Sequence, residues 1–333
     1  MARVMLRPHH RSLLTTTNLA PKPHHYGTTT TPLRKVAARI PPDSWDSHMH
    51  VTDPRYPLAP TAAYTPPLHT LSSALALTDG GYTIRNLVLV QPSIYGADNS
   101  CLLSALRQLG PRHGRAVVGI DTAATSTPPA ALMHEWHALG VRGVRLNLKS
   151  VGAAPDADRL RADVAAHAAA IPAALRDSWV LQVYCSLDAV PLLERVVVGD
   201  GDGSGSSLPA GVKLCIDHFG HPTLPPSPPP PNQAPPDPYA LPGFAALVRL
   251  LRAGGTWVKL SAAYRIERDA RLPWLGAMAR ELCVFATDWP HTRFEAVDVE
   301  PFVEKCLEWC GGDGKKVDRL FRGNAEELWD VKR

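Results

Sequence analysis

The segment SWDSHMH, residues 44–50, predicts the first strand of the fold and places two histidines, His48 and His50, at its end. Side chains alternate along a strand, so these two histidines point to the same face. Seven further short apolar runs follow, at 85–90, 116–120, 141–146, 180–185, 212–217, 256–261 and 282–287. Most are continuous rather than alternating, which is typical of parallel strands buried on both faces.

Helical segments are expected between these strands, at 98–109, 129–139, 156–170, 187–198, 242–253, 269–280 and 294–310, and a last one at 317–329. Eight strands separated by helices predict a single-domain (β/α)8 TIM barrel over residues 41–333. A doubly wound open sheet is the main alternative, because periodicity does not show whether a sheet closes. No G-x-G-x-x-G or Walker sequence follows the early strands, so a nucleotide-binding fold has no positive support.

Two segments stand outside this pattern. Residues 1–40 are basic, rich in Ser and Thr and free of acidic residues, which predicts a disordered leader on a cytoplasmic protein; a mitochondrial transit peptide is the alternative. Residues 222–238 are dominated by proline and are expected to form an extended insert, because proline is excluded from helix interiors and central strands.

Composition excludes several classes of protein. The net charge of +4 over 333 residues is concentrated in the leader, so no nucleic-acid partner is expected. No run of 18 apolar residues is present, which argues against a membrane protein. The six cysteines form no C-x-x-C pair, as expected of a reduced, intracellular protein.

Polar residues recur where predicted strands end. His48 and His50 end the first strand, His218 follows the sixth in IDHFGHP, and Asp288 follows the eighth in FATDWPH. In a TIM barrel, the carboxyl ends of the strands carry the catalytic groups. One histidine after a strand is more often a structural residue, but four such residues at three strand ends predict a catalytic or metal site.

Several segments carry a family resemblance between Trp45 and Trp329. DSHMH, IDHFGHP and ATDWPHTRFE, together with VQPSIYGADN (90–99), RGVRLNL (142–148) and WVKLSAAYR (257–265), form an ordered set. The set resembles the amidohydrolase-related family of the amidohydrolase superfamily, and in particular its 2-pyrone-4,6-dicarboxylate lactonase branch. The resemblance implies hydrolysis of a lactone or an amide-type bond inside a barrel.

The chemistry of lactone opening matches these residues. Asp288 is the expected base that takes a proton from water, and His48, His50 and His218 are expected to stabilise charge on the carbonyl oxygen. Arg145 and Arg265 resemble the substrate-binding arginines of the family, although each could equally be a structural ion-pair partner. The other predicted substrate contacts are Tyr184, Ser93, His221 and His291.

A metal ion is a separate question. The wider superfamily holds one or two divalent ions on such residues, and His48, His50, His218 and Asp288 would suffice for one Zn²⁺. The fifth strand ends in Tyr184 and Cys185, without a bridging ligand, and the lactonase branch implies that no metal is required. We therefore expect metal-independent catalysis, with a single Zn²⁺ or other divalent ion as the alternative.

The sequence departs from the lactonase pattern at two places. His221 stands where the family has an arginine, so the clamp on a substrate carboxylate is weaker. The junction at 276–284 lacks the usual turn between helix and strand, which predicts strain or disorder there. The expected function is hydrolysis of a small anionic lactone; the alternatives are a metal-dependent decarboxylase and a non-catalytic metabolite-binding barrel.

Overall fold

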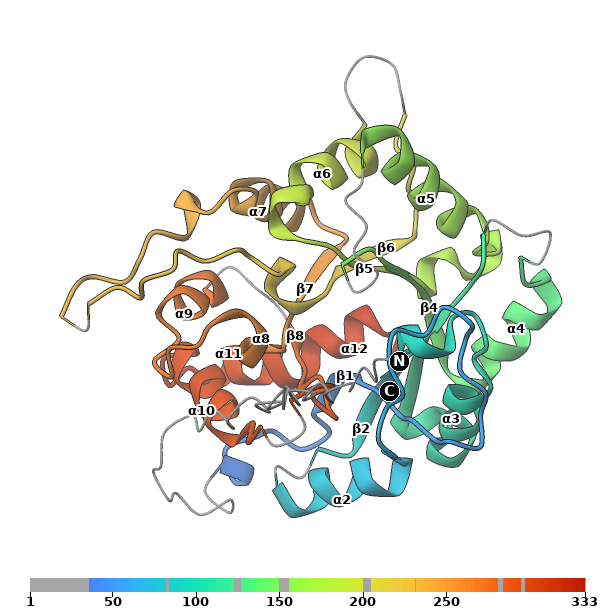
Figure 1. The fold of residues 1–333 in the computed structure, drawn as a ribbon, viewed down its shortest axis with the longest axis horizontal. Helices are drawn as coiled ribbons and strands as arrows, with labels where there is room; N and C mark the ends of the chain where they lie inside the picture. The colour runs from blue at the N-terminus through green and yellow to red at the C-terminus, as the bar shows by residue number, and fades with distance from the viewer. Residues whose placement is uncertain are drawn as a thin grey trace, which may run out of the picture.

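The structure, a computed structural model, describes residues 36–81, 84–122, 127–149, 156–199, 205–230, 232–280, 284–294 and 297–332. Eight strands pair in parallel in the order of the sequence and form the centre of the molecule (Figure 1). The strands are β1 (Trp45–Met49), β2 (Asn86–Val90), β3 (Gly114–Gly119), β4 (Val141–Asn147), β5 (Val180–Tyr184), β6 (Lys213–Ile216), β7 (Thr256–Leu260) and β8 (Val284–Phe285).

The sheet closes on itself between its last and first strands. The backbone N–H of Asp288, just after β8, donates to the carbonyl of His48 at 2.9 Å. The N–H of His50 donates to the carbonyl of Trp289 at 2.7 Å, and Met49 forms a parallel bridge with Trp289. The fold is therefore a (β/α)8 TIM barrel, as predicted, and the open-sheet alternative is excluded.

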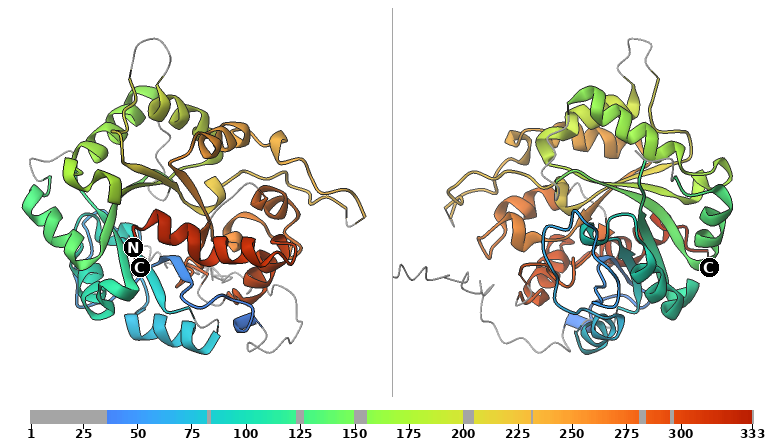
Figure 2. Two further views of the ribbon diagram at one scale, coloured as in Figure 1. Left: turned by 180° about the vertical axis from the view of Figure 1, so that it is seen from behind. Right: turned by 45° about the vertical axis from the view of Figure 1, so that its right-hand side comes forward.

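Helices surround the barrel on its outer side (Figures 1 and 2). They are α2 (Leu71–Gly81), α3 (Ser100–His113), α4 (Ala130–Leu139), α5 (Ala157–Ala169), α6 (Val190–Val198), α7 (Phe244–Ala253), α8 (Ala263–Ile266), α9 (Pro273–Ala279), α10 (Glu300–Trp309), α11 (Gly314–Asp318) and α12 (Asn324–Leu328). Helices α2 and α8 were not predicted. The helix expected at 269–280 begins only at Pro273, because proline favours the first turn of a helix.

The C-terminal segment covers the end of the barrel opposite the carboxyl ends of the strands (Figure 2, left). Trp329, directly after α12, is fully buried, and its indole N–H donates to Ser47 Oγ at 3.1 Å. Arg115 on β3 donates to the Trp329 carbonyl at 3.0 Å, and Lys213 on β6 donates to the Glu327 carbonyl at 2.8 Å. These contacts close the end of the barrel opposite the site, which we call its floor.

The proline-rich insert projects from the barrel as an extended arm between β6 and α7 (Figure 1, at the left). Its described residues up to Asp237 form neither helix nor strand, as expected, and Arg271 binds the carbonyl of Pro229 at 3.1 Å. Most of the expected leader (1–35) and part of the junction (281–283) lie outside the described residues, so the leader boundary and the strain at the junction stay predictions. Among the described helices, none is long and apolar enough to cross a membrane.

Trp329→Ala should destabilise the barrel strongly, because it empties the floor and removes the hydrogen bond to Ser47. We expect the free energy of unfolding in urea to fall by about 3–5 kcal/mol. Val198→Ala, at a side chain that is 61% exposed, is the control and should change it by less than about 0.5 kcal/mol. Equal effects of the two substitutions would contradict the sealing role of Trp329.

Candidate active site

Three imidazoles and one carboxylate meet at the carboxyl ends of β1, β6 and β8. The Nε2 atoms of His48, His50 and His218 each lie 3.7 Å from Oδ1 of Asp288. The two Nε2 atoms of His48 and His50 are 3.3 Å apart. The structure thus brings the four predicted catalytic residues, the first and last of which are 240 positions apart in the sequence, into one cluster.

The outer nitrogen of each imidazole is held by a neighbour. His50 Nδ1 lies 2.7 Å from the Val90 carbonyl at the end of β2, which can only accept a hydrogen bond. His218 Nδ1 lies 2.7 Å from Ser261 Oγ, just after β7. These partners orient the rings so that Nε2 faces the cluster.

The backbone around the cluster is strained. His218, Phe219 and His221 after β6 have φ of 52°, 56° and 46°, and Asp288 and His291 after β8 have φ of 67° and 60°. Left-handed backbone at a residue other than glycine costs about 1–3 kcal/mol and is concentrated at functional sites. The strain arises where the chain turns sharply to aim His218 and Asp288 inward.

Asp288 is oriented by two donors on the short helix α8. The Tyr264 hydroxyl donates to Oδ2 of Asp288 at 2.6 Å, and Arg265 Nε donates to the same oxygen at 3.1 Å. Oδ2 is therefore occupied, and Oδ1 is the oxygen that faces the three imidazoles. Sequence reasoning did not single out Tyr264; its signal was its place beside Arg265 in the WVKLSAAYR segment.

Burial and charge set the protonation of the cluster. Burial, followed by the charge of Lys259, lowers the pKa of His48 well below its ordinary value, and burial with Arg145 lowers that of His50 to about 4. Burial acts to raise the pKa of Asp288, but His218 and Arg265 bring it well below its ordinary value. At neutral pH the cluster therefore combines neutral imidazoles with an ionised carboxylate.

A cavity of about 270 Å³ opens over the cluster. Four of the six predicted substrate contacts line it, namely Ser93, Arg145, Tyr184 and Arg265. The rest of the described lining consists of His50, Ala63, Tyr64, Pro92, Lys149, His218, Asp288, Thr292 and Arg293. The cavity is large enough for a small ring compound, and its lining is rich in cations.

The two predicted arginines line the cavity and also make structural contacts. Arg145 donates to the Gln91 carbonyl at 2.7 Å and lies 3.5 Å from Oδ2 of Asp217. Arg265 binds Asp288 and the Thr292 carbonyl. The two interpretations weighed from the sequence, substrate contact and ion-pair partner, are therefore compatible in this geometry.

His221 and His291 are not part of the described lining. His221 Nδ1 pairs with the Tyr184 hydroxyl at 2.9 Å, while His291 is buried and donates its backbone N–H to the Asp288 carbonyl at 2.8 Å. The predicted contact of these two histidines with a substrate therefore stays a prediction. In this geometry, His221 orients Tyr184 and His291 supports the turn after β8.

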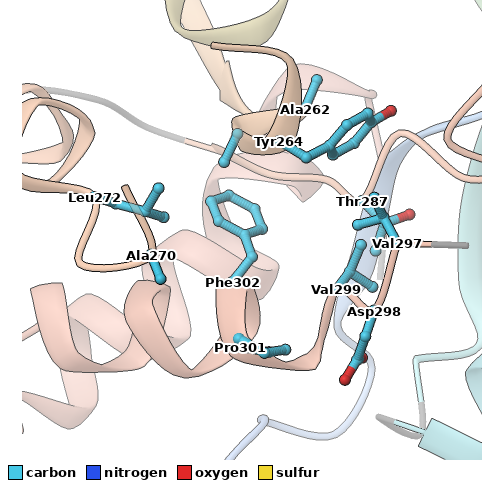
Figure 3. A pocket seen from close by; sticks show the side chains of 11 residues that line it. Ala262, Tyr264, Ala270, Leu272, Thr287, Val297, Asp298, Val299, Pro301 and Phe302 are labelled. Carbon is cyan, nitrogen blue, oxygen red and sulfur yellow. The ribbon is translucent and has the colours of Figure 1, made fainter. Parts of the chain in front are cut away.

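A second pocket lies beside Tyr264, between α8 and the start of α10 (Figure 3). Its lining is mostly apolar, including Leu272, Val297 and Phe302, and its volume of about 10 Å³ holds one water at most. It contains none of the imidazoles of the cluster. The larger cavity over Asp288 is therefore the better candidate for a substrate site.

The cluster fits a divalent metal ion in the kind and spacing of its donor atoms. Ligand atoms about 2.0–2.1 Å from a tetrahedral Zn²⁺ lie about 3.4 Å from one another. The distances of 3.3 Å between Nε2 atoms and 3.7 Å to Asp288 Oδ1 are close to this value. His48, His50 and Asp288 are thus suitable ligands for one ion, and His48, Asp217 and His218 form a second group whose ligand atoms lie close together.

Sequence reasoning also missed three buried polar residues beneath the cluster, Asp217, Gln182 and Lys259. Gln182 donates to Asp217 Oδ2 at 3.0 Å and accepts from Lys259 Nζ at 2.7 Å. The sequence offered a clue to Gln182 and Lys259, because a glutamine and a lysine are unusual in the middle of apolar parallel strands. They mark the polar interior of the barrel.

A TIM barrel with a His-x-His pair after β1, a histidine after β6 and an aspartate after β8 defines a class of hydrolytic barrels. The amidohydrolase family matches residues 45–331, and the chain belongs to this family. The prediction of a hydrolase of the amidohydrolase type is thereby confirmed.

Several known proteins are similar to the chain. A 4-sulfomuconolactone hydrolase from Hydrogenophaga intermedia is 30% identical over 278 residues, covering 79% of this chain and 78% of that protein. A second one, from Rhizobium radiobacter, is 27% identical over 275 residues, covering 78% and 79%.

Solved structures share the fold. A candidate 2-pyrone-4,6-dicarboxylic acid hydrolase from Pseudomonas putida is 29% identical, with a TM-score of 0.64 over 87% of this chain and 98% of that one. An amidohydrolase from Burkholderia multivorans with bound zinc is 20% identical, with a TM-score of 0.60 over 87% and 99%. At 20% identity the likeness concerns the fold alone.

His221 should make folding stability depend on pH. Burial, followed by the charge of His218, lowers its pKa from 6.5 to about 3. The unfolded chain then binds a proton that the folded protein does not bind between these two pH values, so stability falls as pH drops from 6.5 to 3. His221→Asn should lose less stability over this range, by up to about 1.4 kcal/mol per pH unit.

Urea unfolding at pH 7, 5 and 4 measures this difference. Asparagine tolerates the left-handed backbone at this position, and its side-chain oxygen can still accept from Tyr184. If the wild type and His221→Asn show parallel pH profiles, His221 is not held neutral by its surroundings.

Proposed function

We propose that the protein hydrolyses a small anionic lactone. The observation that carries this proposal is the buried carboxyl group of Asp288, with Oδ1 directed at three imidazoles in a cavity lined by four cationic side chains. Both hydrolases named above from Hydrogenophaga and Rhizobium act, by their names, on a sulfonated lactone, which supports the same bond type here.

Asp288 is the base of the proposed reaction. Its Oδ1 takes a proton from a water molecule as the water oxygen attacks the lactone carbonyl carbon. The ester C–O bond of the ring then breaks, and the proton passes to the ring oxygen that leaves. The product is the open-chain acid with one water added. Tyr264 and Arg265 keep Oδ2 occupied, so that Oδ1 is the oxygen available for this proton.

The imidazoles and cations stabilise the developing negative charge. His218 lines the cavity beside Asp288 Oδ1, where its imidazole N–H can donate to the carbonyl oxygen as it becomes an oxyanion. In a buried site such a preorganised donor is worth more than in water. These roles match the residue types without requiring a further group.

The rim of the cavity supplies the recognition of an anionic substituent. Lys149 is exposed there, and the Arg293 guanidinium lies 4.9 Å from the centre of the Tyr64 ring. With Arg145 and Arg265 they give four positive charges against the carboxylates of Asp288 and Asp217. The surplus of positive charge favours a substrate bearing carboxylate or sulfonate groups.

A metal ion is not part of the proposed steps. If one binds, His48, His50, His218 and Asp288 would hold it, and it would supply Lewis-acid polarisation of the carbonyl. Tyr264 and Arg265 orient Asp288 in the same way whether or not a metal ion is bound.

Asp288→Asn should abolish most of the activity, because an amide cannot take the proton from water. We expect kcat/KM for the best lactone of a panel of sulfonated and carboxylated lactones to fall by at least about 1,000-fold. Ring opening is followed by ultraviolet absorbance, with chelator present and absent.

Asp188→Asn, at an exposed position outside the cavity, is the matched control and should retain wild-type rates. An Asp288→Asn protein that opens lactones as fast as the wild type would refute the proposed base. So would a folded wild type that opens no lactone of the panel.

Tyr264→Phe should lower kcat while KM changes little. The substitution keeps the ring and its packing against His291 and Phe294 but removes the hydrogen bond to Asp288 Oδ2. We expect kcat to fall about 10-fold, the scale of one lost hydrogen bond to a charged group. An unchanged kcat in steady-state assays would show that Tyr264 does not position the base.

A further inference from the structure

Lys259 is a buried cation that the proposed reaction does not use. It lies on β7 inside the barrel, is fully buried and is not part of the cavity lining. Its Nζ is 2.7 Å from Gln182 Oε1, 3.4 Å from Asp217 Oδ1 and 3.3 Å from His48 Nδ1. An ammonium can only donate, so Gln182 and His48 accept hydrogen bonds from Lys259, and Asp217 forms an ion pair with it.

Lys259 stands at one end of a line of hydrogen bonds that runs through the two histidines of β1. Lys259 Nζ is bonded to His48 Nδ1, His48 Nε2 to His50 Nε2 at 3.3 Å, and His50 Nδ1 to the Val90 carbonyl at 2.7 Å. An ammonium can only donate and a carbonyl can only accept. With both ends fixed, every hydrogen in the line must point from Lys259 towards Val90.

The alternative partner of His48 is less well placed. Asp217 Oδ1 lies as near to His48 Nδ1 as Lys259 Nζ does, at 3.3 Å, but its position relative to the ring does not meet the geometry of a hydrogen bond, whereas that of Lys259 does. An N–H on His48 Nδ1 would face the Lys259 ammonium and would leave two Nε2 lone pairs opposed across 3.3 Å. Lys259, which donates to His48 Nδ1, therefore sets the tautomer of His48, and Asp217 does not.

We propose that Lys259 is a positioning residue that fixes the tautomers of His48 and His50. In this state His48 carries its proton on Nε2 and His50 carries its proton on Nδ1. His48 thus directs an N–H, which His50 Nε2 accepts, into the cluster instead of a lone pair.

A consequence follows for divalent ions. A metal ligand must present a lone pair, and its second nitrogen usually donates to an acceptor. Lys259 places a donor and a positive charge at that second nitrogen of His48. It therefore opposes metal binding at His48, whose ring otherwise lies with His50 and Asp288 at a spacing that suits one ion. Without Lys259, His48 would be free to donate to Asp217 and turn its lone pair inward.

The first test is the proton position itself. Long-range ¹H–¹⁵N spectra of the full-length, chelator-treated protein report which ring nitrogen is protonated, and the His48→Gln spectrum assigns the signals of His48. We expect a proton on Nε2 of His48 in the wild type and on Nδ1 in Lys259→Met. Lys213→Met, which removes a lysine at the floor of the barrel, is the control and should leave the wild-type pattern.

The second test is the affinity for Zn²⁺, measured by competition with a chromogenic chelator. Lys259→Met should bind Zn²⁺ at least about 10-fold more tightly than the wild type, the scale seen when a partner of a ligand changes. Lys213→Met should match the wild type. Equal or weaker binding by Lys259→Met would overturn the proposal.

The wild-type spectrum decides the question even if Lys259→Met does not fold. A proton on Nδ1 of wild-type His48 contradicts the proposal, and so does a stoichiometric metal ion in the purified protein. Neither measurement involves a lactone. If the protein opens no lactone, the proton position of His48 can still be tested, and a wrong proton position would leave the proposed lactone hydrolysis to be tested by its own assay.

Discussion

The closure of the barrel between β8 and β1 is the constraint on which both fold and site depend. The Asp288 N–H binds the His48 carbonyl, and the His50 N–H binds the Trp289 carbonyl. Asp46 on β1 strengthens the same seam by accepting from the Thr287 N–H at 3.0 Å and from its hydroxyl at 2.6 Å. The hydrogen bonds that close the cylinder therefore also bring the base next to the histidines of β1.

Beneath the cluster, the interior of the barrel holds a network of buried polar residues whose charges are paired. Lys259 and Asp217 are fully buried but contact each other, and Gln182 bridges them. Removing one member would leave a buried charge without its partner, which costs far more than an exposed ion pair contributes. The network also connects the floor, where Lys259 lies 5.2 Å from the centre of the Trp329 ring, to His48 in the site.

Much of this could be predicted from the sequence, and the reasons are physical. Seven short apolar runs and the SWDSHMH segment indicated the eight strands. The ends of these strands indicated His48, His50, His218 and Asp288, because a barrel brings the carboxyl ends of its strands together at one mouth. Tyr264 could not be placed, since its role depends on the short helix α8 after β7. Lys259 and Asp217 depend on contacts between strands that are distant in the sequence. The two arginines could be named, but not their pairing with Asp217 and Asp288.

The account depends on the lactone carbonyl lying within reach of Asp288. A crystal structure of the protein with a non-hydrolysable cyclic analogue of a substrate tests this most directly. We expect the carbonyl carbon of the analogue about 4–5 Å from Asp288 Oδ1, which leaves room for one water between them, and the anionic group near Lys149 and Arg293. An analogue bound more than about 10 Å from Asp288, outside a cavity of this size, would contradict the account.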